Sequence, residues 1–178
     1  MRLSNTKKLA ISGMMTAFTV IMLMLSNIIT IGTYTFPAAA GIFLLILSYV
    51  TGNSYAWSSF TAVSLVSFLF CSDKEAVLCF VLFFGYYPLL KASVEKIRMK
   101  LLCFAVKLIV FNSAAVAVYL TAEYIFAIPQ DFEIFGVSLP IVFLIAFNFI
   151  FLVYDYALTL LERNHRKRIE KFFSALLK

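Results

Sequence analysis

Charged and amide side chains inside long apolar segments are the residues of this chain that could do chemistry. Lys107 and Asp155 each lie about two helical turns inside an apolar run, and Asn112 and Asn148 lie deeper in the same two runs. An ionisable group is costly in an apolar environment, so it indicates a partner or a function. Because their depths match, we expect a Lys107–Asp155 ion pair between adjacent antiparallel helices. Such a pair could serve only to fix helix register, or Lys107 could instead extend toward the membrane surface.

The two asparagines have two interpretations. They could hydrogen-bond to each other, which is worth on the order of 1 kcal/mol. Alternatively, they could face an outward-opening cavity with Tyr119 and Glu123, which fall roughly on the helix face of Asn112. A pocket with aromatic walls and a few polar groups is the usual small-molecule site. Tyr34, in the first outer loop, could cover this cavity, so the candidate substrate-binding residues are Tyr34, Asn112, Tyr119, Glu123 and Asn148.

No familiar catalytic motif accompanies these residues. The sequence has no P-loop, dinucleotide-binding fingerprint, hydrolase elbow or His-Glu-x-x-His motif, and its single histidine, His165, lies in a basic tail. The three cysteines show no metal-ligand spacing. We therefore expect no catalytic residue, no metal and no cofactor, and we do not interpret the chain as an enzyme.

Composition places the candidate residues in a membrane. Of the 178 residues, 63% are hydrophobic and 13% are charged, which is more apolar surface than a soluble domain can bury. We expect an all-α polytopic membrane protein with one domain, residues 1–178, in which Pro88 kinks the fourth span. The predicted spans cover about residues 9–31, 34–50, 55–70, 76–90, 101–126 and 137–161, and an amphipathic basic tail covers 162–178. The first span alone would be about 34 Å long as a helix, enough to cross a bilayer.

The distribution of charge predicts the orientation. With six spans, 13 of the 15 Lys and Arg residues fall on one side of the membrane. The positive-inside rule places that side, and both termini, in the cytoplasm, with the chain in the cell (plasma) membrane. The net charge of +6 then reflects cytoplasmic loops and anionic lipid rather than nucleic acid. Residues 163–178 are expected to bind anionic lipid, with a cytoplasmic partner as the alternative.

The first predicted span carries a stripe of small residues, Ala10, Gly13 and Ala17. Residues three and four apart share a helix face, and small residues let another helix approach closely. The stripe could pack within the same chain, or it could dock on a partner.

The six spans, the cytoplasmic ends and this stripe together resemble the substrate-binding subunits (S components) of energy-coupling factor (ECF) transporters. The segment Lys7-Lys8-Leu9-Ala10 leads into Gly13-x-x-x-Ala17, where the family usually has Ala-x-x-x-Ala. The stretch LFFGYYPLLK, residues 82–91, is also similar to bacterial members of this group.

The resemblance implies a mechanism. A vitamin or similar micronutrient would bind from outside, under the first and third outer loops. Ala10, Gly13 and Ala17 would contact a transmembrane coupling subunit, and two ATPase subunits would power toppling of the S component. The alternative is a non-transporting membrane scaffold or assembly protein, similar to MreD. A transporter subunit needs a polar outward-facing cavity around Asn112 and Asn148, whereas a scaffold fills that space with Leu, Phe and Ile.

Overall fold

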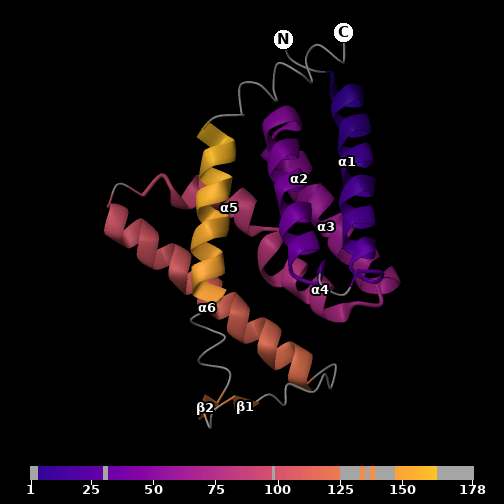
Figure 1. Cartoon of the computed structure of the whole chain (residues 1–178). Helices are drawn as coiled ribbons and strands as arrows, with labels where there is room; N and C mark the ends of the chain where they lie inside the picture. The colour runs from indigo at the N-terminus through magenta and orange to yellow at the C-terminus, as the bar shows by residue number, and fades with distance from the viewer. Residues whose placement is uncertain are drawn as a thin grey trace.

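The protein is almost entirely helical in the computed structural model, which describes residues 4–29, 32–97, 99–124, 133–134, 137–138 and 147–163 (Figure 1). The helices are α1 (Asn5–Leu25), α2 (Thr35–Thr51), α3 (Asn53–Phe70), α4 (Lys74–Cys79), the π-helix η2 (Phe80–Phe84), α5 (Tyr87–Val94), α6 (Lys100–Tyr124) and a helix over 147–163. Two strands of two residues each, β1 (Glu133–Ile134) and β2 (Val137–Ser138), pair antiparallel. The start of α1 and the end of helix 147–163 lie at the same end of the molecule (Figure 1).

Helices α1, α2 and α3 lie side by side around one hydrophobic core. The face of α1 that packs on α2 and α3 buries Ile11, Ser12, Thr19 and Leu23. The hydroxyls of Ser12 and Thr19 donate to backbone carbonyls one turn earlier in α1, at 2.8 and 2.7 Å. Both polar side chains are therefore satisfied without a partner helix, so this face of α1 can be buried.

The chain from Lys74 to Val94 is a bent helical segment made of α4, η2 and α5. The Asp73 carboxylate caps α4 by accepting the Ala76 N–H at 3.0 Å. At the end of η2 the Gly85 N–H donates to the Phe80 carbonyl at 2.8 Å, one residue further back than in an α-helix. Pro88 lies in the first turn of α5, where it costs no hydrogen bond. The regular helix is therefore interrupted before the proline, at a π-helical turn, and not by Pro88 as expected.

Helix α6 runs obliquely across helix 147–163 (Figure 1). Between them and the bent segment lies a second core that is rich in aromatic rings, including Phe83, Tyr87, Phe111, Phe151 and Tyr154. The aromatic core and the α1–α3 core together account for most of the buried side chains that the structure describes.

Two predicted spans have the wrong boundaries. The first, 9–31, extends too far, because α1 ends at Leu25. After Leu25, the Ser26 hydroxyl donates to the Leu23 carbonyl at 2.7 Å, and the Asn27 side chain accepts the Asp73 N–H. The sixth, 137–161, was predicted from hydrophobicity alone, but Val137 pairs with Ile134 in the short hairpin, and the described helix covers 147–163. The predicted tail begins inside this helix, and its residues 164–178 lie outside the described residues.

Among the residues that the structure describes, two helices are long and apolar enough to cross a membrane, judged by length and composition: α1, and α6 from Lys100 to Thr121. Helix α2 is apolar but shorter. Large apolar side chains are exposed on the periphery, including Leu9 and Phe18 of α1, Leu69 of α3, Leu101 of α6 and Phe149. An apolar periphery of this kind suits a lipid surrounding.

Candidate functional site: a buried charge cluster and an amide pair

The structure brings Lys107 and Asp155 together, the two residues that were expected to meet. The Lys107 Nζ lies 2.9 Å from Asp155 Oδ2, and the two side chains are only 9% and 19% exposed. Lys107 belongs to the second turn of α6, and Asp155 lies two turns before the end of helix 147–163. The ion pair therefore links the two helices across a mostly buried contact.

Two further charges join this pair. Lys91, at the end of α5, is 1% exposed, and its Nζ lies 2.7 Å from Asp155 Oδ1 and also contacts Glu95. The Glu95 carboxylate accepts from Lys107 Nζ at 2.7 Å. We call Lys91, Glu95, Lys107 and Asp155 the charge cluster. Each lysine contacts both carboxylates, so the cluster holds two positive and two negative charges and is neutral overall.

Hydroxyl groups complete the surroundings of the charge cluster. The Tyr87 hydroxyl donates to Asp155 Oδ1 at 2.7 Å, and the Thr159 hydroxyl accepts from Lys91 Nζ at 2.8 Å. Thr159 donates in turn to the Asp155 backbone carbonyl at 2.8 Å. A buried ion pair is tolerated when its remaining lone pairs and protons are also bonded. Here the Lys91 ammonium donates three hydrogen bonds, and Asp155 accepts through both carboxylate oxygens.

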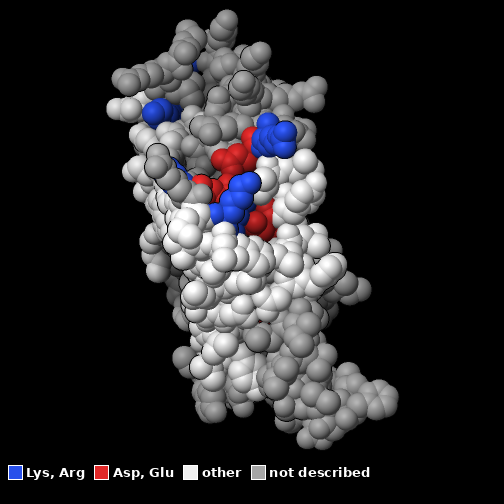
Figure 2. Space-filling model, turned by 90° about the vertical axis from the view of Figure 1, so that its left-hand side faces the viewer, with Lys and Arg blue, Asp and Glu red and all other residues white. Residues whose placement is uncertain are grey.

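The charge cluster opens to the surface at one side. On the face of the molecule that carries the start of α6, acidic and basic side chains gather in one hollow above a broad uncharged surface (Figure 2). Glu95, with a side chain 33% exposed, is the most accessible of the four. Burial favours a higher pKa for Glu95, but the hydrogen bonds and charges of Lys107 and Lys91 outweigh it, so the pKa lies below its ordinary value.

The predicted spans leave out Lys91 and Glu95, because both residues fall between the fourth span, 76–90, and the fifth, 101–126. The interrupted fourth segment continues as α5 to Val94, so Lys91 lies inside a helix and is buried. A signal for this was present, because Tyr87, Lys91 and Glu95 are each four residues apart and share one helix face. Asp155 and Thr159 repeat the same spacing on the other side of the contact.

Asn112 and Asn148 pair with each other. The Asn112 Nδ2 donates to Asn148 Oδ1 at 3.1 Å, and the Asn148 Nδ2 donates to Asn112 Oδ1 at 3.0 Å. Asn112 also donates to the Leu108 carbonyl at 2.8 Å. This reciprocal pair corresponds to the packing interpretation. It lies five residues after Lys107 in α6 and seven residues before Asp155 in helix 147–163.

Tyr34 reaches the neighbourhood of this amide pair from the turn between α1 and α2. Its ring meets Phe147 edge to face, with centroids 5.5 Å apart, and its hydroxyl donates to Glu75 of α4. Thr33 adds a hydrogen bond to Asp73 at 3.1 Å. The α1–α2 turn is thus tied to the α3–α4 turn and to the start of helix 147–163.

Tyr119 and Glu123, the other candidates of the predicted cavity, belong to the same helix as Asn112. They follow it in α6 by about two and three turns. Tyr119 is half-buried, and the structure describes only the backbone of Glu123. The two Asn112–Asn148 hydrogen bonds run between α6 and helix 147–163.

The small-residue stripe of α1 faces away from the rest of the chain. Ala10, Gly13 and Ala17 are all exposed, on the opposite side from the buried residues of α1. A Cβ atom added at Gly13 would meet nothing within 4 Å. Among the described residues, internal packing therefore does not explain the stripe.

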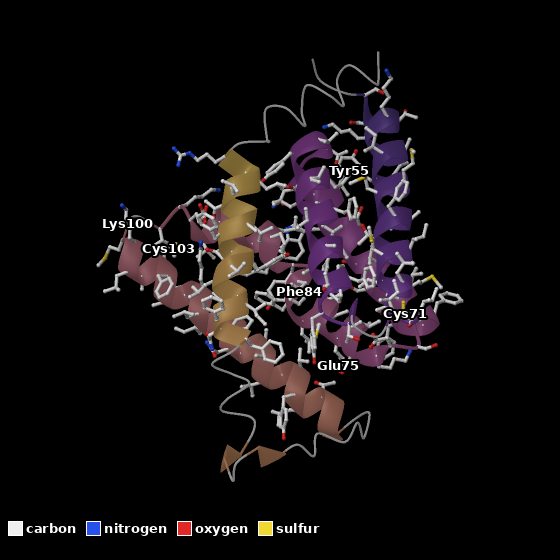
Figure 3. The ribbon with its side chains drawn as sticks, in the orientation of Figure 1. Tyr55, Cys71, Glu75, Phe84, Lys100 and Cys103 are labelled. Atoms are coloured by element: carbon white, nitrogen blue, oxygen red, sulfur yellow. The ribbon has the colours of Figure 1, made fainter. Side chains whose placement is uncertain are left out.

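A close helix contact occurs instead at Gly41 of α2. A Cβ atom added there would overlap the Phe84 backbone carbonyl and come within 2.8 Å of the Tyr154 hydroxyl. Phe84 lies between α2 and helix 147–163 (Figure 3), and its ring meets the Tyr154 ring edge to face at 5.1 Å. Gly41 thus lets the π-helical turn pack directly on α2.

The chemistry available to the charge cluster is electrostatic. It has two carboxylates, and nowhere in the described part of the chain do three His, Cys, Asp or Glu side chains gather as a possible metal site. Comparison with known proteins adds no identification: no family model, no curated protein and no solved structure matches this chain.

Proposed function

We propose that the protein is the membrane-embedded substrate-binding subunit of an ECF-type uptake transporter. The proposal includes six membrane spans, both termini in the cytoplasm, and a location in the plasma membrane. One observation carries it: the stripe Ala10, Gly13 and Ala17 is exposed on α1, a helix that is long and apolar enough to cross a membrane. A smooth unpartnered stripe is the surface on which a coupling-subunit helix could pack closely.

In this proposal the substrate is a small micronutrient that resembles a vitamin, and it binds from outside. The residues proposed to bind it are Tyr34, Asn112, Tyr119, Glu123 and Asn148. The pairing of Asn112 with Asn148, and the contact of Tyr34 with Phe147, support a common location for three of them. A substrate that binds these amides would have to replace the two hydrogen bonds that join Asn112 and Asn148.

The proposed partners follow from the same assignment. The coupling subunit contacts the α1 stripe, and separate ATPase subunits supply energy, because no P-loop occurs in this sequence. Anionic lipid is proposed to bind the basic segment 163–178.

A membrane scaffold or assembly protein, similar to MreD, is the second candidate. It is favoured by the aromatic packing beside the amide pair, where Phe111 and Phe151 stack and Asn112 and Asn148 bond to each other. A filled interior of this kind is what a scaffold requires.

Affinity purification in mild detergent separates the two candidates. The transporter proposal expects recovery of a coupling subunit with its ATPases, and loss of both when Gly13 and Ala17 are replaced by leucine. Phe18→Trp is the matched control, because Phe18 is 55% exposed on the same helix but is neither three nor four residues from any member of the stripe. Purification of the wild-type chain alone, or with cell-wall machinery, would contradict the transporter proposal.

A further inference from the structure

The charge cluster is balanced only while all four members keep their charges. Lys91 and Lys107 are 1% and 9% exposed, so water can compensate little of their charge. Both ammonium groups donate to the same atom, Asp155 Oδ1, at 2.7 and 3.1 Å. Asp155 alone supplies one negative charge for two lysines, and Glu95 supplies the second. Removing the charge of Glu95 therefore leaves one unbalanced positive charge in a buried position, which is strongly unfavourable.

Glu95 differs from the other three members in its place in the fold. It follows α5 directly as its C-terminal cap, in the turn that leads toward α6, whereas the others lie within helices. Its side chain is also the most exposed of the four. Glu95 is therefore the member that solvent, or a cationic group of another molecule, can reach first.

The start of α6 is the part of the structure most able to respond. Lys107 is the first residue of α6 whose side chain makes a buried ionic contact. The preceding side chains of Leu101, Leu102 and Phe104 are 46–79% exposed. Lys100 at the beginning of α6 points away from the molecule (Figure 3). Beyond Lys107, stacking of Phe111 on Phe151 and the amide pair hold α6 independently of the charges.

We infer that Glu95 is an electrostatic lock, whose negative charge holds the first turns of α6 against helix 147–163. Without that charge, Lys107 is repelled by Lys91 and moves away with the first turns of α6, while the helix contact from Phe111 onward is kept. The lock does not depend on the proposed transport function, and it is a property of the isolated chain.

Hydrogen exchange of the full-length protein in detergent micelles at pH 7 tests this inference. Glu95→Gln keeps the side-chain shape and removes the charge. We expect amide exchange over 103–108 to rise by about tenfold or more, with exchange in α1 and over 112–121 unchanged. Glu162→Gln is the matched control, because it makes the same chemical change in helix 147–163 outside the charge cluster, and it should exchange like the wild type.

The double variant Glu95→Gln/Lys107→Gln separates charge balance from simple loss of contacts. It leaves Lys91 with Asp155 as a neutral pair, so exchange over 103–108 should return to within about threefold of the wild type. Wild-type exchange in Glu95→Gln, or faster exchange in the double than in the single variant, would overturn the lock. If Glu95→Gln alone fails to fold, recovery of a folded double variant supports the lock, and failure of both overturns it, because a neutral cluster should fold.

Discussion

Phe111 of α6 and Phe151 of helix 147–163 stack with ring centroids 4.6 Å apart and planes inclined by 14°. This pair lies between the Lys107–Asp155 ion pair on one side and the Asn112–Asn148 amide pair on the other. The order is that of an antiparallel helix contact, in which residue numbers rise along one helix and fall along the other. One ionic, one aromatic and one amide contact thus define a single register for the two helices.

Loss of Asp155 should be the most damaging single change in this register. Asp155→Asn leaves Lys91 and Lys107 with one carboxylate between them, so we expect a loss of about 3 kcal/mol in the free energy of unfolding. Chemical unfolding of the detergent-solubilised protein measures it. Thr159→Val, which removes one neutral hydrogen-bond acceptor from Lys91, should cost only about 1 kcal/mol. Equal effects of the two variants would show that the charge of Asp155 is not what stabilises the contact.

The amide pair should behave as a coupled unit. Asn112→Leu or Asn148→Leu removes both hydrogen bonds between the amides and keeps one of the two polar groups, whereas the double variant removes both polar groups together. A double-mutant cycle on unfolding free energy should therefore give a coupling of about 1 kcal/mol between the two positions. Strict additivity of the two single effects would argue that the two side chains do not depend on each other in the folded protein.

The helix contacts could be predicted from the sequence where two polar residues stand out from apolar surroundings, as Lys107 and Asp155 do. Lys91 does not stand out in this way, because the apolar run ends at Leu90, directly before it. Only the four-residue spacing of Tyr87, Lys91 and Glu95 indicates that the helix continues past it. Similarly, hydropathy cannot distinguish a helix from the hairpin at Val137, where backbone pairing with Ile134 decides the structure. The exposure of Gly13 also depends on how α1 is rotated against α2 and α3, which the spacing of small residues does not determine.

Two glycines should respond in opposite ways to the same substitution. Gly41→Ala places a methyl group against the Phe84 carbonyl and the Tyr154 hydroxyl, so backbone must shift and we expect a loss of about 3 kcal/mol or failure to fold. Gly13→Ala places the methyl group in open space within a helix, which should be neutral or stabilising by up to about 1 kcal/mol. Thermal unfolding of both variants in the same detergent measures the contrast. A destabilised Gly13→Ala variant of the isolated chain would show that the stripe packs internally.

Stability should also depend on pH through Glu95. Its pKa in the folded protein is held below the ordinary value of 4.5 by Lys107 and Lys91, against the opposing effect of burial. The unfolded chain therefore binds a proton at Glu95 at higher pH than the folded protein does. The stabilisation from this group is fully present above about pH 4.5 and is lost as the pH falls through the folded pKa.

The difference in unfolding free energy between wild type and Glu95→Gln isolates this contribution, because the variant cannot titrate at residue 95. We expect the difference to be constant from pH 7 down to about pH 5 and to shrink at lower pH, as Glu95 of the wild type becomes neutral. Glu162→Gln is the control variant, because it makes the same chemical change outside the charge cluster. A difference that grows as the pH falls below 4.5 would mean that the folded protein stabilises the protonated form of Glu95, and that the lysines do not hold its charge.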